Sequence, residues 1–228
     1  RKKLSLLTLV LIIAQMFFVQ TLAAEIKIAL VSPFTGLGSI LGEYIKEGAL
    51  LAVDEINAAG GVNGEQINVV IYDDQADPSV AANVVRRALF DDKVIAIFGP
   101  NMSSAVLGVH ALAQQNKTPM LVGATSPTFR HTAVGNDYLF RLRADDGVKV
   151  DQLVKYAAEV LGIKKPGIIY GSTDYCTAAL DVAEKGFPSY GIEIVAAEQM
   201  REGDKDATGQ LLNLKKAGMD GLIGLTHE

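Results

Sequence analysis

Residues 26–72 have the sequence IKIALVSPFTGLGSILGEYIKEGALLAVDEINAAGGVNGEQINVVIY, and this stretch decides the fold. Its first six residues form a short, mostly apolar run that is rich in branched side chains, which is typical of a buried strand. Apolar residues then recur at three- and four-residue steps over residues 41–59, so we expect a helix with one apolar stripe that ends at the glycine pair behind it. Residues 67–72 are again strand-like. The stretch therefore predicts a strand–helix–strand unit.

The same alternation continues along the chain. Asp77 and Pro78 open the next helix as its cap and first-turn proline, and its buried side is predicted at Val80, Val84 and Ala88. Further strands are predicted at residues 94–98, 119–122, 138–142, 167–170, 192–197 and 220–225, and further helices at residues 103–116, 148–161, 174–190 and 207–217. Strands and helices that take turns with short connections predict an α/β fold with parallel, helix-covered sheets.

The first 24 residues differ in composition from the rest of the chain. Arg1, Lys2 and Lys3 precede an apolar run over residues 4–19, and a run of small residues ends at Ala24. This is the pattern of a secretory signal peptide that is cleaved after Ala24. A membrane anchor is the alternative, but it needs about 20 mostly apolar residues, and polar residues interrupt this run.

Composition excludes several classes of function. The chain has 21 basic and 26 acidic side chains, and three of the basic ones fall in the predicted signal peptide, so we expect no nucleic-acid partner. The single cysteine, Cys176, excludes an internal disulfide and a multi-cysteine zinc site. The three histidines lack the spacing of metal ligands, and we expect no cofactor.

Ser103 and Ser104 start a predicted helix, and residues 99–102 connect this helix to the predicted strand at residues 94–98. Ligands of open parallel sheets bind beyond the carboxyl ends of the strands, and a helix N-terminus there offers unpaired N–H groups to a carboxylate. The two hydroxyl groups would add further donors. The alternative is that Ser103 only caps the helix.

Two further loops lie at the same predicted edge. Gly123, Ala124 and Thr125 follow the strand at residues 119–122 and could turn carbonyl groups and a hydroxyl toward a ligand, or form an ordinary polar turn. Tyr175 lies on the first turn of a predicted helix, where it either closes over a ligand or packs on its own helix. Neighbouring strand ends with such groups favour a binding site.

Nucleotide binding and catalysis find little support. The glycine-rich residues 36–42, with Asp73 and Asp74 beyond, resemble a relaxed dinucleotide fingerprint, but four residues separate the strand from the first glycine. No Gly-x-Ser-x-Gly or Ser-x-x-Lys element occurs. The carboxylates of residues 73–77 are predicted to form a solvated turn with one helix cap. Cys176, for which the sequence shows no nearby histidine, is expected to pack as a small residue.

One family carries the same long motif. Residues 42–64, GEYIKEGALLAVDEINAAGGVNG, resemble the first helix and turn of the periplasmic branched-chain amino acid binding proteins of ABC transporters, and residues 73–78 and 99–104 continue the likeness. It covers nearly all of residues 25–228. The resemblance implies a type I periplasmic binding fold, in which two Rossmann-like α/β lobes close on a ligand like a hinge.

The resemblance also implies a division of the chain. Residues 1–24 are then the signal peptide, residues 25–143 the first lobe without its closing segment, and residues 144–228 part of the second lobe, so that the fold is incomplete at its C-terminus. We therefore expect the chain alone to expose apolar edges and to bind ligand poorly.

The family likeness assigns roles to the candidate site residues. Ser103 and Ser104 are expected to bind the carboxylate of an amino acid or amide-like ligand. The loop Gly123, Ala124 and Thr125 contributes a carbonyl and a hydroxyl, and Tyr175 closes over the ligand from the second lobe.

The chain departs from the family at two of its site positions. Leu41 and His227 stand where members often have an aromatic residue and a tyrosine. The acidic residue that holds the ligand's ammonium group in the family would lie beyond Glu228. Some members of the family carry amides, urea or aromatic acids instead of amino acids.

The implied function is transport without chemistry. We expect an exported, monomeric, leucine-binding-like protein of the periplasm that captures a small molecule and delivers it to an inner-membrane ABC permease. The alternative is an extracellular ligand-sensing module of a receptor or regulator that uses the same fold.

Overall fold

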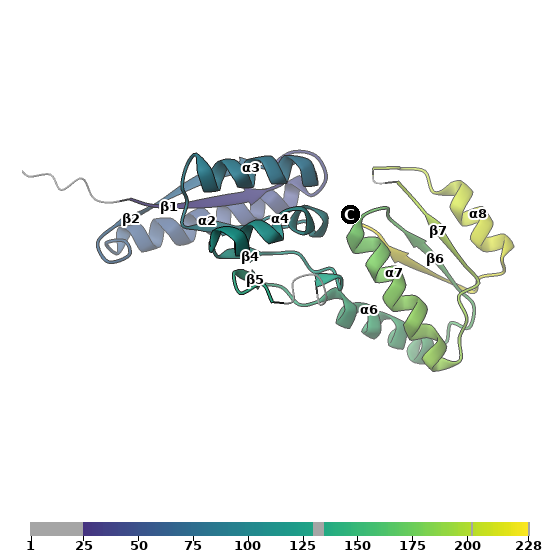
Figure 1. The fold of residues 1–228 in the computed structure, drawn as a ribbon. Coiled ribbons are helices and arrows are strands. Elements are labelled where there is room, and N and C mark those ends of the chain that lie inside the picture. The colour runs from purple at the N-terminus through teal and green to yellow at the C-terminus, as the bar shows by residue number, and fades with distance from the viewer. Residues whose placement is uncertain (1–24, 130–134, 202, 228) are drawn as a thin grey trace, which may run out of the picture.

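The computed structural model describes residues 25–129, 135–201 and 203–227. The predicted signal peptide lies outside these residues. Within them the chain forms two α/β units that lie side by side, each built on its own parallel sheet (Figure 1). No helix in the described part of the chain has the length and apolarity needed to span a membrane.

The N-terminal unit is a five-stranded sheet with the strand order β2-β1-β3-β4-β5, and all its pairings are parallel. Its strands are β1 (Glu25–Ser32), β2 (Gln66–Asp73), β3 (Ala96–Phe98), β4 (Met120–Val122) and β5 (Leu139–Arg141). Its helices are α2 (Ser39–Ala58), α3 (Pro78–Phe90) and α4 (Ser103–Asn116). Helices α3 and α4 pack together over a shared core with one face of the sheet, and α2 lies over the other face.

Helix α3 has the cap that the sequence predicts, but the residues on its buried side differ from the prediction. Asp77 accepts hydrogen bonds from the N–H groups of the second and third helical residues, and Pro78 is the first. The buried residues are Ala81, Val85 and Ala88, so the prediction of Val80 and Val84 is wrong by one position. The two valines lie half-buried on the flank, because the small side chain of Ala81 lets the helix approach the sheet closely.

Helix α2 is largely solvent-exposed, and Gly42 is its only buried residue. A Cβ atom at Gly42 would lie 1.9 Å from the carbonyl oxygen of Pro33, so this close approach requires glycine. The predicted apolar stripe borders a groove of about 550 Å³ between α2 and the sheet, where Ile45 and Ala49 are only half-buried. The apolar stripe therefore faces the sheet as predicted, but no described residue packs closely against it.

The C-terminal unit has a three-stranded parallel sheet with the order β7-β6-β8. Its strands are β6 (Pro166–Tyr170), β7 (Ala196–Gln199) and β8 (Gly221–Leu225). Its helices are α6 (Asp146–Lys155), which continues as the π-helix η1 (Tyr156–Val160), then α7 (Asp174–Gly186), which continues as the 3-10 helix η2 (Phe187–Tyr190), and α8 (Thr208–Lys216). Phe187, fully buried, packs in the core of this unit.

One strand of this unit is displaced from its prediction. The apolar residues 192–197 predicted a strand, but β7 begins only at Ala196, where pairing with Gly167 of β6 starts. Ile192 instead buries its side chain in the core directly after Gly191, whose φ of 69° ends the preceding turn. The apolar pattern there reflects burial of a loop and not strand pairing.

The chain crosses between the units over residues 141–146. The N–H of Asp146 donates to the carbonyl oxygen of Thr125 over 2.9 Å, and Arg141 pairs with Asp145 at 3.1 Å. A further contact between the units joins the Thr128 hydroxyl to Asp174 at 3.4 Å. The lobe boundary between residues 143 and 144 stays a prediction.

Candidate functional site

A pocket of about 630 Å³ lies between the two units. The N-terminal unit lines it with the loop after β1, the start of α2 and the loop after β3, and also with Thr125 after β4. The C-terminal unit contributes Tyr175 after β6, residues 226 and 227 after β8, and the start of α6. Most of these segments follow the carboxyl end of a parallel strand, which is where such folds place their ligands.

The start of α4 is arranged to receive an anion. Met102 is the N-cap, and its side chain offers no capping hydrogen bond, so the alternative that Ser103 caps the helix is wrong. Ser103 is the first helical residue, and its Oγ accepts a hydrogen bond from the N–H of Ser126 at 3.2 Å. No described residue accepts the Ser103 hydroxyl hydrogen, which therefore remains available to a ligand. Ser103 lines the pocket, whereas Ser104 does not.

The loop after β4 contributes only one of its three predicted residues. Thr125 lines the pocket, where its hydroxyl can meet a ligand, and its carbonyl oxygen accepts the N–H of Asp146. Ala124 is buried in the core, and Gly123 makes room for Asn101. A Cβ at Gly123 would lie 2.3 Å from the Asn101 Oδ1, which needs this space because its amide also donates to Ser32 Oγ at 3.2 Å.

Tyr175 and His227 form an aromatic pair on the opposite wall. Their ring centroids lie 4.9 Å apart, and both rings line the pocket. The pKa of the Tyr175 hydroxyl is raised by burial and, secondarily, by the charge of Asp146. Thr173 Oγ1 lies 3.0 Å from His227 Nε2 and donates to the Cys176 thiol at 3.3 Å.

The fold places near Cys176 a histidine that the sequence does not show there. Strand β8 brings His227 close to the cysteine through Thr173, which the sequence could not show. The thiol side chain is nonetheless fully buried in the C-terminal unit, so packing remains the role that its surroundings support.

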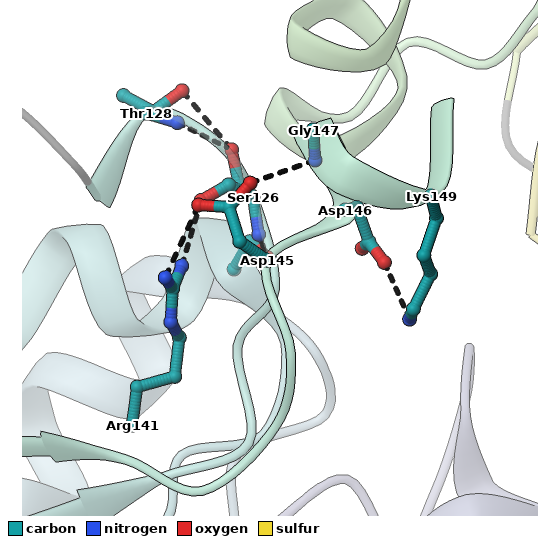
Figure 2. Close-up of polar contacts among 8 residues, drawn as sticks. Ser126, Thr128, Arg141, Asp145, Asp146, Gly147 and Lys149 are labelled. Atoms are coloured by element: carbon teal, nitrogen blue, oxygen red, sulfur yellow. Dashed lines mark hydrogen bonds and ion pairs between the residues drawn. The ribbon is translucent and has the colours of Figure 1, made fainter. Parts of the chain in front are cut away.

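Sequence reasoning missed the charged groups of the pocket. Arg143, Asp146 and Lys149 all line it, and they come from the crossing and from the start of α6. Asp146 is 3% exposed and pairs with Lys149 Nζ at 2.5 Å. Figure 2 shows that this pair points away from the Arg141 and Asp145 side of the crossing. The charge rise at residues 141–146 was the only signal, and it was used only to predict a boundary.

Asp73 holds the loop that forms one wall of the pocket. Its carboxylate accepts hydrogen bonds from the N–H of Phe34 at 2.9 Å, from the hydroxyl of Thr35 at 2.6 Å and from the N–H of Gln75 at 2.9 Å. Partial burial alone would raise its pKa, but these hydrogen bonds lower it below the ordinary value. Asp73 is therefore a structural anchor of the loop after β1.

Asp74 contradicts the expectation of a solvated turn. It is fully buried, and burial raises its pKa to about 6. One oxygen accepts the N–H of Ala76 at 3.0 Å, while the other has no hydrogen-bond partner among the described residues. No group of acidic, histidine and cysteine residues in the described ranges has the arrangement of a metal site.

Two α/β units that enclose a ligand-sized pocket at the carboxyl ends of their strands define the class of bilobal ligand-binding proteins. The chain belongs to the periplasmic binding protein family, whose model matches residues 25–227. The leucine-, isoleucine-, valine-, threonine- and alanine-binding protein of Pseudomonas aeruginosa is 32% identical over 198 residues, which are 86% of this chain and 52% of that protein.

Solved structures place the fold among the type I periplasmic binding proteins. The branched-chain amino acid transporter substrate-binding protein LivJ of Streptococcus pneumoniae, solved with isoleucine, is 31% identical with a TM-score of 0.78, over 88% of this chain and 57% of that one. A solute-binding protein of an ABC transporter from Rhodopseudomonas palustris, solved with 3,4-dihydroxybenzoic acid, is 25% identical with a TM-score of 0.77, over 88% and 54%. The chain thus spans about half the length of the relatives that it matches.

Proposed function

We propose that this protein is the exported solute-binding component of an ABC importer, which captures a small amino acid between its two units and delivers it to an inner-membrane permease. The family is a class of solute-binding proteins of the periplasm. The named ligands of relatives at 31–32% identity are branched-chain and other small amino acids. The predicted signal peptide at residues 1–24 agrees with export, and we expect a monomer that performs no chemistry.

The start of α4 is the observation that carries this proposal. A helix N-terminus without a capping side chain presents N–H groups and a partial positive charge to the pocket. The hydroxyl of Ser103 adds a second kind of donor, and the Thr125 hydroxyl lies on the wall beside it. Together they suit the carboxylate of an amino acid, while Leu37, Ile40 and Leu41 give the same pocket an apolar wall for a side chain.

The test is isothermal titration calorimetry on the full-length mature protein. The panel contains leucine, isoleucine, valine, small aliphatic amides and hydroxybenzoates. We expect an amino acid to bind, and Ser103→Ala and Thr125→Val each to weaken it about 10- to 100-fold, because a hydrogen bond to a charged group is lost.

Ser104→Ala is the matched control. It removes a neighbouring hydroxyl that does not line the pocket, so the affinity should stay within about twofold of the parent. If no compound of the panel binds, or if Ser103→Ala and Thr125→Val leave affinity unchanged, the proposed site is wrong.

A further inference from the structure

Ser126 is fully buried directly after the pocket residue Thr125, and it does not line the pocket itself. Its N–H donates to Ser103 Oγ at 3.2 Å, and Arg141 Nη1 lies 3.5 Å from its carbonyl oxygen. Its hydroxyl donates to the Thr128 hydroxyl at 3.0 Å and accepts the N–H of Thr128 at 3.2 Å (Figure 2). Every polar group of Ser126 is therefore engaged within the protein.

Thr128 extends these contacts to the C-terminal unit. Its hydroxyl accepts from Ser126 and donates to Asp174 Oδ1 at 3.4 Å, across the boundary between the two units. The donors thus run in one direction, from the Ser126 hydroxyl to the Thr128 hydroxyl and on to a carboxylate. Hydrogen bonds in such a chain polarise one another, and a charged acceptor strengthens them.

The carboxylate of Asp174 is incompletely satisfied. Its other oxygen, Oδ2, is buried and accepts no hydrogen bond from the described residues. The contact with Thr128 is also longer than the usual distance of about 2.5–3.0 Å for an O–H···O bond. A small approach of the two units would therefore strengthen this contact, and a small separation would break it.

Asp174 directly precedes Tyr175, whose ring lines the pocket on the wall opposite Ser103. The contact between Thr128 and Asp174 therefore sets how far the two walls lie from each other. Neither Thr128 nor Asp174 lines the pocket. They can thus affect the width of the pocket without touching a ligand.

We propose that Thr128 and Asp174 form a latch between the two units, and that Ser126 couples this latch to the Ser103 hydroxyl. A ligand carboxylate that accepts the Ser103 hydrogen makes Ser103 Oγ a better acceptor for the N–H of Ser126. This fixes the loop that carries Thr128 and favours the closed latch. The coupling to the ligand rests on the proposed binding of an amino acid, whereas the latch itself does not.

Thr128→Val tests the latch, because it removes the hydroxyl group and keeps the branched shape. Leucine, isoleucine and valine are titrated into the full-length mature protein by calorimetry, and leucine dissociation is followed by stopped flow. We expect affinity to fall about three- to tenfold, the scale of one hydrogen bond, through faster dissociation. The factor should be the same for all three amino acids, since Thr128 does not touch the ligand.

Two variants serve as controls. Thr128→Ser keeps the hydroxyl group and should retain the parent's affinity within about twofold. Asp181→Ala removes an exposed aspartate of the same helix as Asp174, where it pairs with Lys185 outside the pocket, and should also leave affinity unchanged.

Double variants test whether the residues act as one unit. Asp174→Ala and Ser126→Ala should each weaken leucine binding as Thr128→Val does. Combining either with Thr128→Val should add nothing, because each substitution breaks the same chain of hydrogen bonds. Losses that add up in the double variants would overturn the proposal, as would a loss confined to one of the three amino acids.

Small-angle X-ray scattering tests the latch without a ligand. The ligand-free Thr128→Val variant should have a larger radius of gyration than the ligand-free parent, because the units separate more readily. Equal radii would show that Thr128 and Asp174 do not hold the units together. If the parent binds none of the three amino acids, the proposed function fails, while the scattering comparison still supports or refutes the latch.

Discussion

The N–H of Asp146 and the carbonyl oxygen of Thr125, 2.9 Å apart, join the two units at the point where the chain crosses between them. Both residues also line the pocket, so the hydrogen bond lies at the base of the candidate site. A rotation of one unit about this point would change the distance between Tyr175 and the wall at Leu41, but hardly that between Thr125 and Asp146. Such hinge closure around a fixed base is a common way to enclose a ligand.

Gly123 should tolerate no larger residue. A Cβ there would lie 2.3 Å from Asn101 Oδ1, so Gly123→Ala must displace Asn101 from Ser32 or shift the loop. We expect the free energy of unfolding to fall by about 1–3 kcal/mol in urea titrations. Gly209→Ala, on α8 with open space around it, should be neutral or stabilising by up to about 1 kcal/mol. Equal effects of the two substitutions would refute this role of Gly123.

Asp73→Ala should lower both stability and ligand affinity. It removes the acceptor that holds Phe34 and Thr35, so we expect a loss of about 1–3 kcal/mol in the free energy of unfolding. Leu37 in this loop lines the pocket, so ligand affinity should fall when the loop is no longer held in place. The control is Asp77→Ala in the same turn, which costs about 1 kcal/mol as a lost helix cap but should leave affinity intact. Affinity that is unchanged in Asp73→Ala would contradict the anchoring role.

Local patterns were enough to predict most of the elements. The helix predicted at residues 103–116 is confirmed to the residue: a short loop separates it from β3, and it ends where Lys117 adopts a positive φ of 52°. The apolar pattern predicted the wrong element where one apolar run, residues 192–197, is part buried loop and part strand. Ile192 is as buried as a strand residue, yet it belongs to a loop.

The residues of the candidate site also fall into those that local patterns predict and those that they do not. Ser103, Thr125 and Tyr175 follow strand ends, so the general position of ligand sites in parallel sheets was enough to select them. Asp146 and Lys149 were not selected, because their place in the pocket depends on how the two units meet at the crossing. A pattern within one segment carries no information about that arrangement.

Tyr175 should respond in opposite directions to two nearby charges. The charge of Asp146 raises the pKa of its hydroxyl, after burial, and that of Arg143 lowers it. Asp146→Asn should therefore lower the pKa of Tyr175, and Arg143→Gln should raise it further. NMR titration of labelled tyrosine, with Tyr175→Phe to assign the signal, measures both. Shifts of the same sign in the two variants would show that these charges do not act on Tyr175.

Asp74 should make the fold less stable as the pH rises. Burial raises its pKa from 3.8 to about 6, so the folded protein prefers the protonated carboxyl group. Below pH 3.8 this preference does not lower the free energy of unfolding, because the unfolded chain is protonated as well. Between pH 3.8 and 6 the unfolded chain loses its proton first, and the free energy of unfolding falls by roughly 3 kcal/mol over this range.

Asp74→Asn should remove this dependence, because an amide does not ionise and still offers an oxygen to the N–H of Ala76. The variant should gain stability relative to the parent as the pH rises from 4 to 8, when both are compared by urea unfolding at each pH. Asp206→Asn serves as the control, since Asp206 is exposed and its pKa is lowered by its bonds to Thr208. A stability difference between Asp74→Asn and the parent that stays constant from pH 4 to 8 would show that Asp74 is ionised normally in the fold.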